Sequence, residues 1–264
     1  MHRPSSDTGP EQAGGRPGTT PPVPGRWSVH SQYTRRYTRR LAVPLILAIV
    51  LLVLTVQVMA ESGPSIALDR IVRDGVRNLA DATAAAWLDG PMHTLADLGG
   101  PLPAGLALAA AGLFAAWRLR RAYPITIAAG AVLVVTVAVI GGKALIGRTG
   151  PSESPLPADQ WGFFPSGHTA TSTICYGTAA LLLGRVGSAR AARRWHRGAG
   201  VLCAAIGFSL LWCDYHWLAD VLAAWALCGI VLWAAAHLTT RMATRPTGRP
   251  ADRTTTGSGG RLAR

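Results

Sequence analysis

The chain has 264 residues, of which 49% are hydrophobic and only 15% are charged, and its mean hydropathy is +0.26. This composition excludes an ordinary soluble domain of that length. The formal net charge is +13, but the arginines fall in short blocks between apolar runs. That distribution argues against a basic nucleic-acid-binding domain and is typical of a membrane protein.

The N-terminal part of the sequence changes from polar to apolar at about residue 40. Residues 1 to about 26 are rich in Pro, Gly, Ser and Thr, which predicts a disordered tail. Four arginines then precede an apolar run at Leu41–Ala60, and twenty helical residues extend about 30 Å, enough to cross a bilayer. A signal peptide is the alternative, because Val58-Met59-Ala60 resembles a cleavage site. We favour a retained span, since the run is longer than a typical signal core.

Residues 61–102 mix apolar and charged residues at helical spacing. Apolar residues such as Leu68, Ile71 and Leu79 alternate with charged ones, which predicts an amphipathic helix that ends at Gly99-Gly100-Pro101. Such a helix lies on the membrane surface, or it packs over the mouth of a helix bundle. The sequence leaves both possibilities open.

Five further apolar runs follow, at about 102–117, 124–142, 166–184, 199–213 and 218–238. With six spans and a cytoplasmic N-terminus, 21 of the 26 basic residues fall in cytoplasmic segments. This asymmetry follows the positive-inside rule, so both termini are expected in the cytoplasm. The four cysteines lie in or beside these runs without a CxxC pair, which indicates small buried side chains with no metal or disulfide role.

The sequence therefore predicts an all-α integral membrane protein with three parts. Residues 1–40 form a disordered basic cytoplasmic tail, and residues 239–264 form a second one. Residues 41–238 form a six-helix bundle in the cytoplasmic membrane, with a short amphipathic helix on the extracytoplasmic side.

The predicted topology brings three loop ends to the outer face, after the third span and before the fourth and sixth. They carry the chemically capable residues Lys143, Arg148, Ser166, Gly167, His168, Asp214, His216 and Asp220. Ionisable groups at membrane depth are costly, which makes them functional candidates. Singly, each has a plain structural explanation, such as a lysine at a span end or a capping histidine. Their convergence from three segments favours a site.

A set of this kind suits phosphoryl transfer at an anion site. His216 fits the role of nucleophile, with the carboxylate of Asp220 fixing its tautomer, and His168 fits the role of general acid. The groups available for the phosphate oxygens are those of Lys143, Arg148, Ser166 and Gly167 and the first N–H groups of the helix after Pro165. No acidic cluster suited to Mg²⁺ or Ca²⁺ lies beside them in the sequence. We therefore expect a metal-independent reaction without a cofactor.

Three sequence blocks resemble the type 2 phosphatidic acid phosphatase superfamily, which also contains the vanadium haloperoxidases. The blocks are Lys143 to Pro151, Pro-Ser-Gly-His at 165–168, and His216-x-x-x-Asp220, and the resemblance extends over about residues 41–238. It implies the same nucleophile, orienting carboxylate and general acid that the residues suggest by themselves. The phosphate-binding residues it implies are Lys143, Ser166 and Gly167.

The sequence departs from this family at two positions. The first block usually reads Lys, six residues, Arg-Pro, but Gly150 precedes Pro151 here, and Arg148 stands two residues earlier as a substitute. The third block usually has Ser-Arg before the histidine, but Ser209-Leu210 stands here. Two phosphate-binding arginines that the resemblance implies are therefore missing. Asp214 also adds a negative charge near His216.

These observations predict a membrane phosphatase of the bacterial lipid-phosphatase type, acting at the outer face on a lipid or isoprenoid phosphomonoester or diphosphate. A phosphohistidine intermediate is expected, with the bilayer and the lipid phosphate as partners and no nucleic acid. One alternative is a lipid phosphotransferase that uses the same site. Another is a catalytically weak protein that binds lipid phosphate, which the missing arginines favour. A haloperoxidase fits poorly, because those enzymes are mostly soluble.

Overall fold

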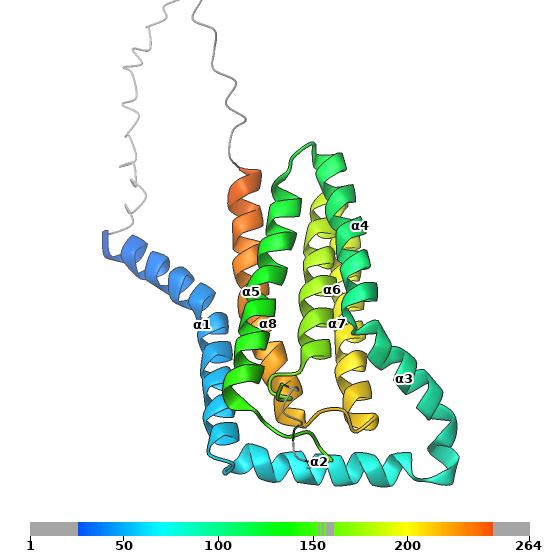
Figure 1. Ribbon diagram of the computed structural model, residues 1–264. Coiled ribbons are helices and arrows are strands. Elements are labelled where there is room, and N and C mark those ends of the chain that lie inside the picture. The colour runs from blue at the N-terminus through cyan, green and yellow to red at the C-terminus, as the bar shows by residue number, and fades with distance from the viewer. Residues whose placement is uncertain (1–25, 153, 155, 157–160, 245–264) are drawn as a thin grey trace, which may run out of the picture. The chain divides into compact units, whose positions relative to one another are not determined.

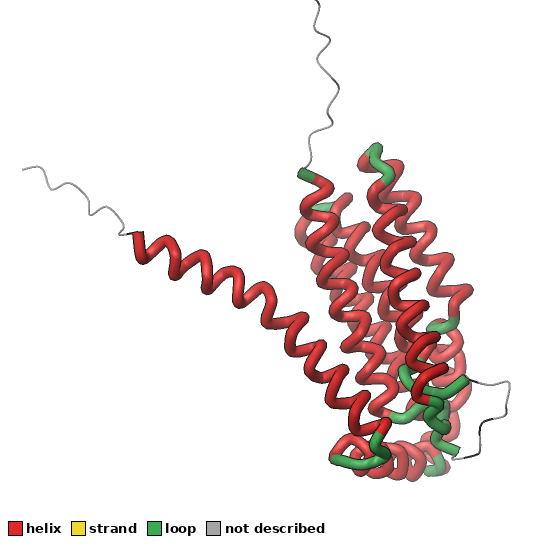
Figure 2. Tube along the Cα trace, turned by 60° about the vertical axis from the view of Figure 1, so that its left-hand side comes forward, coloured by secondary structure: helices red, strands yellow, loops and turns green. Residues whose placement is uncertain are grey.

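A computed structural model describes residues 26–152, 154, 156 and 161–244 of the chain. Contacts divide the chain into two units, residues 1–42 and 43–264, and the fold below is that of the second unit. All regular structure within the described ranges is helical, as Figures 1 and 2 show. The all-α prediction is therefore confirmed for this part of the chain.

The helices follow one another with short connections, apart from the segment between residues 147 and 166. They are α1 (Arg26–Met59), α2 (Pro64–Ala80), a short 3-10 helix (Thr83–Leu88), α3 (Asp89–Leu98), α4 (Pro101–Leu119), α5 (Tyr123–Ile146), α6 (Gly167–Val186), α7 (Ala189–Trp212) and α8 (Leu218–Ala243). Each of the six predicted apolar runs lies in one of the long helices.

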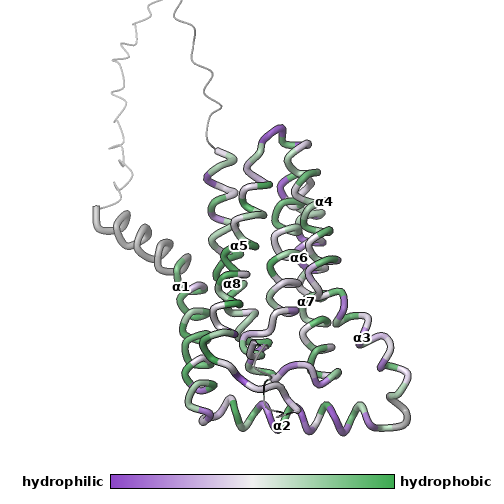
Figure 3. The backbone as a smooth tube through the Cα atoms, in the orientation of Figure 1, coloured by the Kyte–Doolittle hydropathy of each residue, from purple (hydrophilic) through white to green (hydrophobic). Residues whose placement is uncertain are grey.

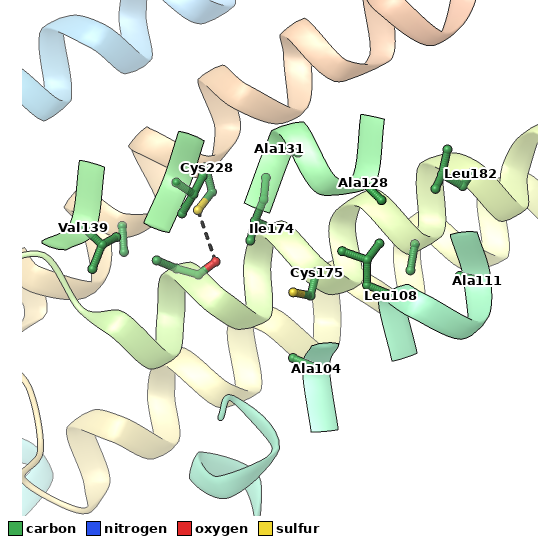
Figure 4. Close-up of a cluster of buried hydrophobic side chains, with 14 of the residues drawn as sticks. Ala104, Leu108, Ala111, Ala128, Ala131, Val139, Ile174, Cys175, Leu182 and Cys228 are labelled. Atoms are coloured by element: carbon green, nitrogen blue, oxygen red, sulfur yellow. Dashed lines mark hydrogen bonds between the residues drawn. The ribbon is translucent and has the colours of Figure 1, made fainter. Parts of the chain in front are cut away.

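Helix α6 lies at the centre of the bundle and packs against α4, α5, α7 and α8. The core around it is built largely from alanines and from a few larger residues such as Leu108, Ile174 and Leu182 (Figure 4). Small side chains let helix backbones approach closely, which is how membrane helices gain packing energy. The thiol of Cys228 on α8 donates to the carbonyl of Ala170 on α6 at 3.4 Å, which joins the two helices.

Four helices in the described part are long and apolar enough to cross a membrane: Leu41–Met59, Pro101–Leu119, Tyr123–Ile146 and Leu218–Ala243. The other two predicted spans, α6 and α7, are less apolar for different reasons. Helix α6 carries Thr and Ser side chains that are buried against its neighbours, and the first half of α7 carries four arginines. Figure 3 shows hydrophobic residues along much of α5 and of the coloured part of α1, whereas hydrophobic and hydrophilic residues alternate along α2.

The predicted domain boundaries differ from the helix ends. Helix α1 begins at Arg26, inside the segment 1–40 that the sequence assigned to a disordered tail. Helix α8 continues to Ala243, beyond the predicted boundary at residue 238. The remaining parts of both predicted tails, residues 1–25 and 245–264, lie outside the described residues.

The segment 61–102 is divided into α2, the 3-10 helix and α3 instead of forming one helix. Helix α2 lies across one end of the bundle and packs against α7 and α8 (Figure 1). It buries the carboxylate of Asp69, whose residue is 2% exposed, while Ile71 and Leu79 on the same helix are 68% and 54% exposed. A charged side chain thus faces the protein, and apolar ones face outward.

Gly207 of α7 leaves room for the side chain of Trp225 of α8, and this contact can be tested. A Cβ atom at residue 207 would lie 2.5 Å from Cζ2 of Trp225, whereas one at Gly198 on the same helix would meet nothing within 4 Å. Gly207→Ala is expected to lower the thermal denaturation midpoint in detergent, because overpacking costs about 1–3 kcal/mol. Gly198→Ala, the matched control, should leave it unchanged or raise it, since Ala favours helix over Gly. Equal midpoints for the two variants would contradict this packing.

Candidate active site

Backbone hydrogen bonds bring the three predicted blocks together at the end of the bundle where α2 lies. The N–H of Ser166 donates to the carbonyl of Asp220 at 3.1 Å, which joins the start of α6 to the start of α8. The N–H of Gly162 donates to the carbonyl of Lys143 at 3.2 Å. A Cβ atom at residue 162 would lie 2.8 Å from Cα of Gly147, so this contact between the loop and the end of α5 requires a glycine.

His216 and Asp220 form a buried pair. Nδ1 of His216 lies 3.2 Å from Oδ2 of Asp220, and the residues are 9% and 0% exposed. The same carboxylate oxygen accepts from the N–H of Trp217 at 3.2 Å. A spacing of four residues places two side chains on one face of a helix, but His216 precedes α8, and the contact is made around the N-cap of α8, Trp217. A carboxylate at Nδ1 favours the tautomer with its lone pair on Nε2.

His168 and His216 line the same cavity, which has a volume of about 440 Å³. His168 lies in the first turn of α6 and is exposed, whereas His216 is buried beneath the ring of Phe163, at a centroid distance of 5.6 Å. The residues that line this histidine pocket are Gly150, Pro151, Ser152, Phe163, His168, Leu210, Asp214, Tyr215 and His216. Both histidines that the sequence selected are therefore brought together.

The first turn of α6 provides the expected helix N-terminus beside His168. Ser166 is its N-cap, and the Ser166 hydroxyl accepts from the N–H of Thr169 at 3.3 Å. This hydroxyl is fully buried, so it positions the helix start and retains its own proton as a donor. The predicted helix start is confirmed. The terminal N–H groups of such a helix carry partial positive charge, which favours an anion.

Lys143 lies near this helix start, on the last turn of α5. Its Cε atom would be 3.7 Å from a Cβ atom at Gly167, and its ammonium donates to the carbonyl of Gly162 at 2.8 Å. The ammonium is also 5.9 Å from the ring centroid of Phe163. In the described part of the chain, no carboxylate lies within ion-pair distance of Lys143. Its charge is thus not matched by a directly bonded carboxylate.

Arg148 lies behind the histidine pair and, like Lys143, Ser166 and Gly167, is absent from the lining of the histidine pocket. Its guanidinium donates to Oδ1 of Asp220 at 2.6 Å and to Oδ2 of Asp69 at 2.5 Å. It lines a separate cavity of about 350 Å³, together with Asp69 and Trp217. These contacts favour a role for Arg148 in holding the carboxylate of Asp220, in place of the predicted phosphate contact.

Asp69 of α2 completes this ion network, and the sequence did not single it out. Its Oδ1 atom accepts from the N–H of Ala219 at 2.7 Å, within the first turn of α8. Burial raises the pKa of the Asp69 carboxyl, and the hydrogen bond from Arg148 opposes this rise. In the sequence, Asp69 looks like Asp74, another acidic residue of the same segment. Only burial distinguishes the two.

Asp214 is paired with Arg73 of α2, which changes the prediction that it adds a negative charge near His216. The guanidinium donates to both carboxylate oxygens of Asp214 at 2.8 Å. These hydrogen bonds lower the pKa of Asp214, because they favour its charged form. The charge that Asp214 brings to the pocket is therefore largely neutralised.

Helix α3 contacts the same loop between α7 and α8. The indole N–H of Trp212 donates to Asp89 at 2.9 Å, and Nδ1 of His93 lies 3.1 Å from the hydroxyl of Tyr215. Trp212 and Trp217 are 3% and 6% exposed. These two tryptophans therefore pack inside the protein around the site.

The geometry offers no obvious metal centre. Within the residues that the structure describes, no three His, Cys, Asp or Glu side chains are grouped so that they could hold a metal ion. The four cysteines are free thiols, and Cys175, Cys203 and Cys228 are buried.

Comparisons with known proteins agree with this arrangement. Residues 124–243 match the model of the PAP2 superfamily. Among solved structures, the chain is similar to a transmembrane PAP2-type phosphatidylglycerolphosphate phosphatase from Bacillus subtilis, with a TM-score of 0.63 and 18% sequence identity. The similarity covers 76% of this chain and 97% of that one. At this identity the likeness shows a shared fold. No curated protein sequence matches the chain.

The Arg73–Asp214 pair predicts a pH-dependent contribution to stability. The folded-state pKa of Asp214 is lowered from its ordinary value of 3.8, so the pair stabilises the fold above that value and loses its effect as the pH falls through the lowered pKa. Asp214→Asn is expected to lower the denaturation midpoint at pH 7, and the difference from the wild type should shrink as the pH falls below 3.8. Differential scanning fluorimetry in detergent measures the denaturation midpoints of both proteins at each pH.

Asp74, an exposed residue of α2, gives the control, because Asp74→Asn removes a carboxylate but keeps the Arg73–Asp214 pair. A difference between the wild type and Asp214→Asn that stays constant from neutral pH down to pH 3 would show that the pair is not its cause.

Proposed function

We propose that the chain is a membrane phosphatase for a lipid or isoprenoid phosphomonoester or diphosphate, because residues 124–243 match the model of the PAP2 superfamily. The reaction passes through a phosphohistidine, and the site lies on the extracytoplasmic side of the cytoplasmic membrane. The observation that carries the proposal is one pocket lined by two histidines, of which His216 is backed by the fully buried carboxylate of Asp220.

The first step transfers the phosphoryl group to the protein. Nε2 of His216 attacks phosphorus as the bond from phosphorus to the leaving oxygen breaks, and His168 gives its proton to that oxygen. The products are an alcohol, or a monophosphate from a diphosphate substrate, and phosphohistidine at residue 216. Asp220 keeps the proton on Nδ1 and stabilises the positive charge that develops on the ring.

The second step returns the site to its starting state. His168, now neutral, takes a proton from water, and the water oxygen attacks phosphorus as the phosphorus–nitrogen bond breaks. Inorganic phosphate leaves, and His216 regains its lone pair on Nε2. In both steps the phosphate oxygens are held by the ammonium of Lys143, the hydroxyl of Ser166 and the N–H of Gly167. These groups lie around the start of α6.

The proposed topology has six spans with both termini in the cytoplasm. Four helices meet the length and composition of a span, α6 packs against three of them, and α7 packs against α6. Arginines cluster at the turn between α4 and α5 and at the turn between α6 and α7, and Figure 1 shows these turns at the end of the bundle opposite α2. Under the positive-inside rule, this distribution supports a pocket on the extracytoplasmic side. Exposed Ile71 and Leu79 suit α2 to the membrane surface there.

One structural observation favours a second function, the binding of a lipid phosphate with little turnover. Gly150 and Leu210, which occupy the positions of the two missing arginines, both line the histidine pocket. A Cβ atom at Gly150 would lie 2.8 Å from the ring of Phe163, and Leu210 is packed against Ala96 and Ile206 in a buried apolar cluster. Neither place holds a cation. A charge-assisted hydrogen bond contributes about 1.5–3 kcal/mol, so this loss weakens phosphate binding.

The proposal predicts that phosphate release depends on both histidines. Purified protein should release phosphate from phosphatidic acid or an isoprenyl diphosphate, with inhibition by vanadate. His216→Ala should lower the rate at least about a thousandfold, because the nucleophile is lost. His168→Ala should lower it about 10²–10⁴-fold, because proton transfer is lost.

His196→Ala is the matched control, since this histidine lies near the start of α7, far along the helix from the pocket. It should retain the wild-type rate. Undiminished release from His216→Ala would rule out the mechanism. Tight lipid phosphate binding without turnover, across a broad substrate panel, would establish the second function. A new phosphoester formed with an added alcohol would indicate transfer.

A further inference from the structure

The carboxylate of Asp220 is fixed from two sides. Its Oδ2 atom is 3.2 Å from Nδ1 of His216, and its Oδ1 atom accepts from Arg148 at 2.6 Å. The other arm of that guanidinium reaches Asp69, which lies on α2 and outside residues 124–243. We propose that Asp69 is a positioning residue for the reaction, holding Asp220 against His216 through Arg148. This inference rests on the proposed function.

The hydrogen bonds of this network leave little freedom to its members. Both oxygens of Asp69 are used, one by Arg148 and the other by the N–H of Ala219 at 2.7 Å. Arg148 cannot rotate away from Asp220 without leaving Asp69, because a planar guanidinium presents its two arms in a fixed fork. Asp69 therefore ties α2 to the start of α8 and sets the direction from which Arg148 meets Asp220.

Burial makes the network costly to break. The exposures of Asp69, Asp220 and the Arg148 side chain are 2%, 0% and 11%. A buried ion whose partner is removed is left without solvation, and such a loss is strongly destabilising. A carboxylate that only stabilised its own helix would not need to bond residues outside that helix, as Asp69 of α2 bonds Arg148 and Ala219. Through Arg148, Asp69 is connected to Asp220, the residue proposed to orient His216.

The network also sets the charge behind His216. Two carboxylates and one guanidinium leave a net charge of −1, which stabilises the positive ring that forms when Nε2 takes up a phosphoryl group or a proton. Other titratable and charged groups also face this histidine. They are Lys143 from α5, His168 from α6, Asp214 with its partner Arg73, and Tyr215 with its neighbour His93. The test must therefore change the network alone.

Three variants change this charge in different directions. Asp69→Asn leaves a net charge of zero, Arg148→Gln leaves −2, and the double variant returns it to −1. The acid limb of the kcat/KM profile reports the free His216, which must be unprotonated to attack. That limb should shift by roughly one pH unit to lower pH in Asp69→Asn and to higher pH in Arg148→Gln. It should return to the wild-type position in the double variant.

The rate gives a second readout. Asp69→Asn should lower kcat about 10–100-fold, as is typical when a residue that orients a reacting group is lost. KM should change far less, because Asp69 does not line the histidine pocket. Asp74→Asn, an exposed carboxylate on the same helix, is the control and should keep both the rate and the pH profile. The measurements use the full chain in detergent with phosphatidic acid as substrate.

The outcomes separate this inference from the proposed function. If the wild type does not turn over, or if His216→Ala remains active, the proposed function fails. If the wild type is active and depends on His216, but Asp69→Asn behaves like Asp74→Asn, the inference alone is wrong. If Asp69→Asn does not fold, Arg148→Gln, which keeps the Asp69 carboxylate, still decides. An acid limb at the wild-type position in Arg148→Gln would overturn the inference.

Discussion

The buried carboxylate of Asp220 is the contact on which the candidate site depends. The two carboxylate oxygens contact His216, Arg148 and the N–H of Trp217, and the backbone carbonyl of Asp220 accepts from the N–H of Ser166. One residue therefore joins the proposed nucleophile, the ion network and the helix whose start forms the proposed anion site. A fully buried carboxylate is tolerated only with such partners, so the surrounding elements have to be placed correctly before the charge is stable.

The bundle supplies this placement. Helix α6 is surrounded by four neighbours, and its small side chains fix its position along them, so its N-terminus is held at a constant height beside α8. Helices α2 and α3 then cover the same end through Arg73–Asp214, Asp69–Arg148 and Trp212–Asp89. The site thus combines residues of the segment 124–243, which matches the PAP2 superfamily model, with side chains from helices that precede it in the chain.

The sequence predicted the parts of the site that depend on local spacing and on topology. The helix start at Ser166, the pairing of His216 with Asp220 and the meeting of His168 with His216 all follow from short motifs on loops at one face. The partners of Arg148, Asp214 and Asp69 could not be predicted, because each pairing joins side chains far apart in the chain. Long-range ion pairs leave no periodic signal. Likewise, α6 is less apolar than a typical span because protein, not lipid, surrounds it.

The position of the phosphoryl group during turnover tests the proposed mechanism most directly. Protein quenched at alkaline pH while it hydrolyses a lipid phosphate can be digested and mapped by tandem mass spectrometry. The geometry predicts phosphate on the imidazole of His216, at Nε2, because Nδ1 faces Asp220 at 3.2 Å. Phosphate on His168 or on another residue, or steady turnover with no phosphorylated histidine, would contradict the role assigned to the His216–Asp220 pair.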